Sequence, residues 1–189
     1  MKNSLLILIA LLLCTTSLSA QSDGPGQVVK TNPFGFFAGQ YQFGYEHALS
    51  DKISVQMSAG IITSSGSTFD DNLQTVPTKR SGFLVIPEFR FYPSGNSCEG
   101  FYIGALVRYR TVSWTIDDVD WYNRNVFGGA TVLGYQWYGD GMMVDVFVGP
   151  QFKTVNTEWF DETYEDVSEL FGGGGNGGVR FGMNIGFGW

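Results

Sequence analysis

The feature that most constrains the fold is a one-for-one alternation of apolar residues with polar residues or glycine. It is clearest in the C-terminal stretch VRFGMNIGFGW, where the apolar set is Val179, Phe181, Met183, Ile185, Phe187 and Trp189. Successive side chains of a β-strand point to opposite faces, so the pattern predicts a strand with one apolar face. Similar segments of about ten residues recur along the chain, near 27–36, 40–49, 53–63, 81–92, 100–114, 124–138, 142–154 and 177–189. We therefore expect an all-β chain of eight antiparallel strands.

The connections between these segments alternate in length. They are short at 49–52, 93–100 and 139–141, and longer, polar and acidic at 64–80, 115–123 and 155–176. Short turns at one end and long loops at the other are typical of an up-and-down barrel of the outer membrane. Residues 27–49 fit either two strands or one long bent strand, because Pro33, Gly35 and Gly39 interrupt them without a clear turn.

Residues 1–20, MKNSLLILIALLLCTTSLSA, have a basic start, a short apolar run and small polar residues before Ala20. The apolar run is too short to span a bilayer as a helix, so it predicts a secretory signal peptide. We place the cleavage after Ala20, with Ser19 as the alternative, and assign residues 21–189 to one barrel domain. Cys98 is then the one cysteine left, and no internal disulfide is expected.

The composition favours a membrane barrel over a soluble one. Charged residues make up 15% of the chain, below the roughly 25% of soluble domains, and aromatic residues make up 16% beside 26 glycines. An eight-stranded barrel has an interior only wide enough for side chains, so the many rings of the apolar face must point outward. The formal net charge of −7 argues against a nucleic-acid partner. We expect a transmembrane barrel with a polar, filled lumen.

The polar face carries charges of both signs, which the alternation places inside the barrel. Buried charges persist when they are paired and hydrogen-bonded, so we expect a structural charge network, formed by Glu46, Glu88, Arg90, Arg108, Arg110, Asp145, Lys153 and Arg180. The alternative is a narrow, gated path for small ions, which would favour anions because basic groups outnumber acidic ones.

The chain resembles the small eight-stranded outer-membrane barrels, such as OmpX and the transmembrane domain of OmpA. The stretches GYEHALSDKISV, IPEFRFYPS and GFYIGALVRYR and the terminal strand carry the resemblance. It implies a location in the outer membrane, among lipid and lipopolysaccharide. It also implies that the terminal strand serves as a signal for the barrel-assembly machinery, through Phe181, Met183, Ile185, Phe187 and Trp189. A resemblance of this kind implies a fold and little about activity.

Other chemistry-bearing residues give weaker signals. His47 is the one histidine, and in the outward register it is expected to be an interfacial residue. Some small barrels modify lipid A with histidine and serine, but His47 lies beside a short turn rather than at the loop end. Acidic residues gather in two of the longer connections, at Asp117, Asp118, Asp120, Asp161, Glu162, Glu165, Asp166 and Glu169. Their spacing does not match a calcium loop, so a solvated acidic surface is expected. Residues 156–178 also hold apolar residues at helical spacing, which predicts a short amphipathic helix.

From these observations we expect a non-enzymatic integral outer-membrane barrel without cofactor or metal. Its role is predicted to be structural or to involve a surface ligand bound by the acidic extracellular loops. A narrow ion pore and a lipid-modifying enzyme remain as alternatives.

Overall fold

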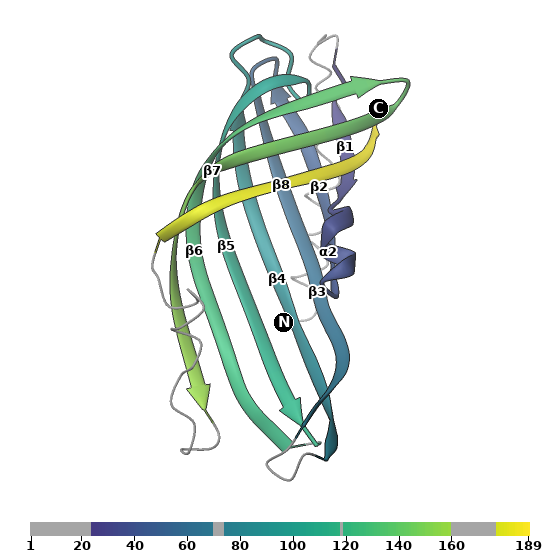
Figure 1. Cartoon of the computed structure of the whole chain (residues 1–189). Helices are drawn as coiled ribbons and strands as arrows, with labels where there is room; N and C mark the ends of the chain where they lie inside the picture. The colour runs from purple at the N-terminus through teal and green to yellow at the C-terminus, as the bar shows by residue number, and fades with distance from the viewer. Residues whose placement is uncertain (1–23, 70–73, 118, 160–176) are drawn as a thin grey trace, which may run out of the picture.

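The computed structural model describes residues 24–69, 74–117, 119–159 and 177–189, which form a closed barrel of eight antiparallel strands (Figure 1). The elements in chain order are β1 (Gln27–Thr31), α2 (Pro33–Phe37), β2 (Gln40–Ser50), β3 (Ile53–Phe69), β4 (Thr75–Phe91), β5 (Gly100–Ile116), β6 (Val119–Gly139), β7 (Met142–Trp159) and β8 (Gly177–Gly188). Each strand pairs with its neighbours in the chain, and β1 pairs with β8 to close the sheet. The predicted all-β, eight-stranded, up-and-down barrel is confirmed. The predicted signal peptide, residues 1–20, lies outside the described residues.

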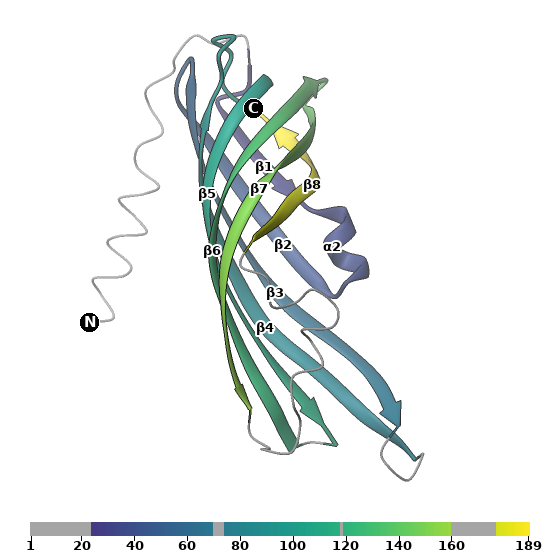
Figure 2. The ribbon, with the colours of Figure 1, turned by 60° about the vertical axis from the view of Figure 1, so that its left-hand side comes forward.

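The first strand is much shorter than the 27–36 expected from the sequence. β1 ends at Thr31, and the helix α2 begins directly after it, with the Asn32 side chain accepting a hydrogen bond from the Gly35 backbone nitrogen at 3.1 Å. Pro33 favours this start because its fixed φ suits the first turn of a helix. Residues 27–49 therefore hold two strands separated by a helix. Helix α2 contacts both β2 and β8, beyond the point where β1 ends (Figure 2).

Barrel closure is confined to a short length. β1 pairs with β8 only from Val28 opposite Gly188 to Thr31 opposite Ile185. The pairing of β2 with β3 ends at Gln40 opposite Ile62, and that of β8 with β7 ends at Gly177 opposite Phe152. Beyond these points β3 to β7 continue as a five-stranded sheet, which we call the extension (Figure 1).

The extension corrects two of the loop predictions. The expected loop at 64–80 is mostly a continuous hairpin, paired from Ser64 opposite Arg80 to Phe69 opposite Thr75. The expected loop at 115–123 is also mostly strand, paired out to Ile116 opposite Val119. In the third connection, β7 runs on to Trp159, and the helix predicted within 156–178 falls largely outside the described residues.

The outward face of the closed part is a belt of exposed apolar side chains. On β4 the belt runs from Phe83 to Phe91, and on β5 from Phe101 to Tyr109. Phe181 of β8 is 79% exposed, which for a large apolar side chain calls for an apolar surrounding. In the extension the outward residues are mostly polar. Among the described residues, no helix is long and apolar enough to cross a bilayer.

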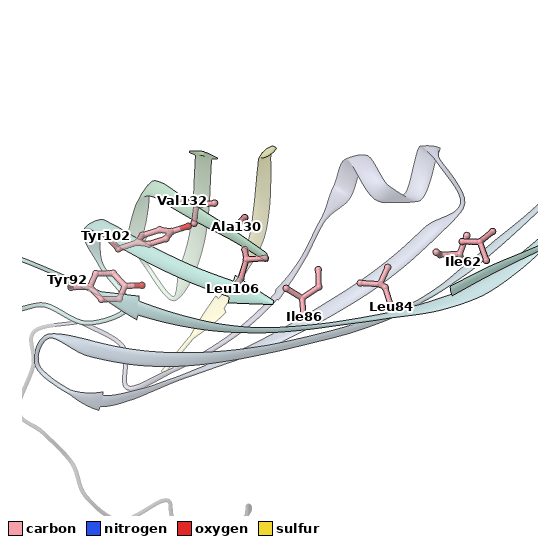
Figure 3. Packing of buried hydrophobic residues seen from close by; sticks show 9 residues of the cluster. Ile62, Leu84, Ile86, Tyr92, Tyr102, Leu106, Ala130 and Val132 are labelled. Carbon is pink, nitrogen blue, oxygen red and sulfur yellow. The ribbon is translucent and has the colours of Figure 1, made fainter. Parts of the chain in front are cut away.

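The lumen is arranged in layers along the strands, and it is less polar than the sequence suggested. On β4, β5 and β6 a polar group near the short turns is followed by aliphatic residues and then by basic residues. The aliphatic layer is buried on the inner face (Figure 3), with Ile62, Leu84, Ile86, Leu106, Ala130 and Val132. This layer separates the charged groups at the two ends of the lumen.

Candidate functional site

The polar layer near the short turns is a network with one member from every strand. In strand order its members are Lys30, Glu46, Ser54, Arg90, Tyr102, Gln136, Asp145 and Asn184. We call this set the eight-strand network. The Lys30 and Arg90 side chains are 2% and 0% exposed, and those of Glu46 and Asp145 are 0% exposed.

Arg90 lies at the centre of the eight-strand network. Its Nη2 lies 3.1 Å from an oxygen of Asp145, its Nη1 donates to Gln136 Oε1 at 2.9 Å, and its Nε donates to Glu88 at 2.7 Å. Nη1 also lies 3.4 Å from Glu46, and the guanidinium carbon is 4.1 Å from the centre of the Tyr102 ring. The planar five-donor group of arginine suits such a position, where acceptors converge from several strands.

Lys30 supplies the second cation from β1. Its Nζ lies 2.5 Å from Glu46, 3.2 Å from Gln136 Oε1 and 3.4 Å from Asp145. Glu46 also accepts hydrogen bonds from the hydroxyl groups of Ser54 and Tyr92. Its charge is therefore held by two cations and two hydroxyl donors, as buried carboxylates require.

Asp145 connects the cations to β5 and β8, and Gln136 connects them to the turn between β4 and β5. Asp145 accepts hydrogen bonds from the Tyr102 hydroxyl at 2.8 Å and from Asn184 Nδ2 at 3.1 Å. The Gln136 amide donates to the backbone oxygen of Cys98 at 2.7 Å. Cys98 has a positive φ of 65° in the turn between β4 and β5, and its free thiol is buried. The network thus fills the lumen from wall to wall.

Glycines on the inner face make room for the large members of the network. A Cβ at Gly134 would overlap the ring of Tyr102, and a Cβ at Gly104 would lie 2.9 Å from Glu88 Oε1. Such distances are too short for any real side chain. Gly104 and Gly134 therefore leave space for neighbouring side chains in a narrow interior.

The predicted charge residues separate into two groups. Glu46, Glu88, Arg90 and Asp145 are brought together by the ion pairs described above. The other four lie beyond, on the far side of or beside the aliphatic layer, namely Arg108, Arg110, Lys153 and Arg180. In the described part of the chain, none of these four has a carboxylate within ion-pair distance. The eight residues therefore do not form the single network expected from the sequence.

Three residues of the second group, Arg108, Arg110 and Lys153, line a cavity of about 350 Å³ on the inner face of β4 to β7. We call it the basic pocket, and its cations are Arg80, Arg108, Arg110, Arg124 and Lys153. None of the described residues that line it is acidic. The rings of Trp114 and Tyr122 stack in its wall, with centroids 5.8 Å apart and planes inclined by 28°. Arg180 lies outside it, with its guanidinium 5.5 Å from the ring of Phe147.

Sequence reasoning missed important residues of both groups. Lys30 was overlooked because the first strand is short, although its alternation with Val29 and Thr31 gave a usable signal. Arg80 lies in the stretch 64–80, which the sequence predicts as a loop and which is mostly strand in the structure. Tyr102 and Gln136 carry no formal charge, so a search of the polar face for charged residues does not find them, although both are hydrogen-bonded in the network.

The terminal strand lies as its pattern predicts, on the outside of the barrel. Phe181, Phe187 and Trp189 are exposed, and the backbone nitrogen of Trp189 donates to Gln27 at 3.0 Å, beside β1. Ile185 also faces outward, whereas Met183 is half-buried. The position of the strand does not test whether the barrel-assembly machinery recognises it, so that recognition stays a prediction.

The predicted acidic loops and the histidine show no assembled site in the part of the chain described. Asp117 is at the β5–β6 hairpin tip with a φ of 51°, and Asp120 accepts a hydrogen bond from Thr115 at 3.2 Å. Asp118, Asp161, Glu162, Glu165, Asp166 and Glu169 lie outside the described residues. His47 stacks against Tyr45, with ring centroids 6.4 Å apart. No group of three or more potential metal ligands is found among the described residues.

Comparison with known proteins gives a family and two similar structures. A family profile described as "Protein of unknown function (DUF3575)" matches residues 6–164. The solved structure of CarO from Acinetobacter baumannii is similar with a TM-score of 0.44 and 13% identity, over 87% of this chain and 98% of that one. CarO2 from the same organism gives a TM-score of 0.47 and 10% identity over the same shares. No curated protein matches the chain in sequence.

Proposed function

Since the chain belongs to the family of proteins of unknown function DUF3575, we propose from its own structure that it is a non-enzymatic integral protein of the outer membrane. In this proposal the barrel is closed to ions by the eight-strand network, and its role is structural or to bind ligands at its surface. Lipid and lipopolysaccharide surround it, and its terminal strand is read by the barrel-assembly machinery. A closer likeness to OmpX and OmpA is part of this proposal.

The apolar belt supports insertion into a membrane. Its stretches from Phe83 to Phe91 and from Phe101 to Tyr109 match the roughly 9–11 residues of a tilted transmembrane strand. The extension, with its polar outer surface, then projects beyond the lipid. Because bacterial outer-membrane barrels keep short turns in the periplasm and longer connections outside, the extension and the basic pocket face the exterior.

The observation that carries the proposal of a closed barrel is the eight-strand network itself. Its charged side chains are almost completely buried and bond across the lumen rather than to one wall. A path for ions through this layer would need several ion pairs to break together, and breaking one buried pair costs about 3–5 kcal/mol. The aliphatic layer beside it adds a second barrier, since it offers an ion no polar partner.

The surroundings of His47 support a non-enzymatic role. A histidine that activates a serine needs that serine within hydrogen-bond reach and a third group to orient the ring. In the described part of the chain His47 Nδ1 has no hydrogen-bond partner, and the ring lies against Tyr45. We therefore expect lipid A from cells with and without the intact gene to give identical mass spectra.

Electrical recording in planar bilayers tests the closed state directly. Folded wild-type protein is expected to give no steady openings in high KCl, because the network occupies the lumen. A parallel labelling experiment from the lipid phase tests insertion, with Phe89 and Val107 expected to react and Arg90 to be spared. Steady wild-type openings would replace the closed barrel by the narrow, gated ion pore, whereas labelling of Arg90 would overturn the membrane orientation itself.

A further inference from the structure

We propose that the basic pocket is a binding site for a phosphate-bearing anion. The proposal goes beyond the structural role given above and relies on it only for the side from which the ligand arrives. The pocket is a defined cavity of about 350 Å³, large enough for a phosphate or diphosphate group with part of its carrier. Its lining comes from four adjacent strands rather than from one flexible segment.

Three of the five cations of the basic pocket lack an acidic partner in the part of the chain that the structure describes. Arg80, Arg108 and Arg110 have no carboxylate within ion-pair distance there, in contrast to the two cations of the eight-strand network. Like charges gathered in a partly enclosed cavity repel one another, and an anion of two or more charges removes that repulsion. A carboxylate carries one charge, so phosphate is the better match for several arginines.

Two buried N–H donors in residues that line the basic pocket also favour a phosphate ligand. Arg110 Nε and Trp114 Nε1 are both buried atoms without a hydrogen-bond partner among the described residues. Buried donors are normally satisfied by protein or by ordered water, so two orphans in one cavity wall are unusual. Guanidinium groups donate two parallel hydrogen bonds to phosphate oxygens, which gives directional as well as electrostatic recognition.

The position of the pocket determines which phosphates can reach it. The pocket is separated from the eight-strand network by the aliphatic layer, and its strands continue into the extension, where β3 and β7 are not joined by β2 and β8. A ligand therefore enters from the exterior side. Two sources carry the required group there: a soluble phosphate or diphosphate, and the phosphorylated headgroup of a glycolipid in the outer leaflet.

The test measures binding by folded full-length protein in zwitterionic detergent, using calorimetry at low salt. One arm titrates inorganic pyrophosphate, and the other titrates bisphosphorylated lipid A and its dephosphorylated form in mixed micelles. We expect saturable binding of one equivalent, at least in one arm, that weakens as NaCl is raised. Binding of pyrophosphate identifies a soluble ligand, whereas binding of phosphorylated lipid A alone identifies a headgroup.

Matched variants locate the site. Lys153→Gln removes a cation of the pocket, and Lys52→Gln removes an exposed cation in the short turn at the opposite end with the same change of net charge. Lys153→Gln and Arg110→Met are each expected to weaken binding about tenfold or more, with Lys52→Gln near wild type. Heat-dependent gel mobility confirms that each variant is folded.

Two results overturn the proposal. One is the absence of saturable binding in both arms by folded wild-type protein. The other is an equal loss of affinity in Lys52→Gln and Lys153→Gln, which reveals attraction to overall charge rather than a site. Neither result affects the closed barrel, because conductance and lipid labelling test that separately.

Discussion

Both ends of the lumen carry charged side chains that point inward, but the two ends differ in the acidic partners that they offer to these charges. Near the short turns, Lys30 and Arg90 meet Glu46, Glu88 and Asp145 within a layer to which all eight strands contribute. Toward the extension, five cations line a cavity whose described lining contains no acidic residue. The closed wall supplies ion-pair partners from several strands. Arg80, Arg108 and Arg110 have no carboxylate within ion-pair distance among the described residues.

This contrast shows that inward register alone does not define the role of a charge. On β4, Arg90 and Arg80 have the same orientation on one strand, separated by the aliphatic residues Ile86 and Leu84. Arg90 has four polar partners from other positions, while Arg80 opens into the basic pocket. Stability is therefore expected to depend on the first end and ligand recognition on the second.

The largest expected effect comes from removing the central cation of the eight-strand network. Arg90→Met leaves Glu46, Glu88 and Asp145 buried with Lys30 alone, so the free energy of unfolding should fall by about 3–5 kcal/mol. Urea unfolding of the protein refolded in lipid vesicles, followed by tryptophan fluorescence, measures it. Arg110→Met is the control at the other end, and comparable losses in both variants would contradict the division of roles.

A smaller effect is expected from a change that adds volume rather than removing charge. Gly134→Ala places a methyl group against the Tyr102 ring, which must move away from Asp145 and Arg90. The expected loss in free energy of unfolding is about 1–3 kcal/mol, the usual cost of overpacking. Gly139→Ala on the same strand is the control, because its added Cβ meets nothing within 4 Å. The same urea titration compares them, and equal stability of the two variants would show that the ring is not held tightly.

The smallest effect is expected at the basic pocket, with the opposite sign. Arg110→Met removes one of several like charges, so it should raise the free energy of unfolding by up to about 1 kcal/mol at low salt. Added NaCl screens the remaining repulsion, so the gap between variant and wild type should narrow. Urea midpoints measured across a salt series check this, and a loss of stability at low salt would mean that Arg110 has a stabilising partner.

The sequence was most informative where one face of a strand meets an apolar surrounding. There the alternation is strict, as on β5 from Phe101 to Tyr109, and both the strand and its orientation could be predicted. In the extension both faces of β3 are exposed, as at Ser64 and Ser65. No apolar contrast remains, so a period of two is invisible and the strand resembles a polar loop.

The candidate sites were predictable only in part, because alternation indicates which face a residue occupies but not its position along the barrel axis. Alternation places Glu46, Arg90 and Asp145 inside, but it carries no information about how far along the axis each one lies. That position depends on strand tilt and on register between neighbours, as in Gln136 opposite Asp145. The separation of Arg108 and Arg110 from the acidic residues is a consequence of this register, and one sequence does not specify it.

The composition of the eight-strand network has a consequence for biogenesis. Until β1 docks beside β8, the carboxylate of Asp145 on β7 lacks the ammonium group of Lys30. Closure one residue out of register between β1 and β8 would not bring Lys30 beside Asp145, which would leave this buried carboxylate with one cation fewer. We therefore expect pairing of β1 with β8 in the native register to be favoured by the ion pair that it forms between Lys30 and Asp145.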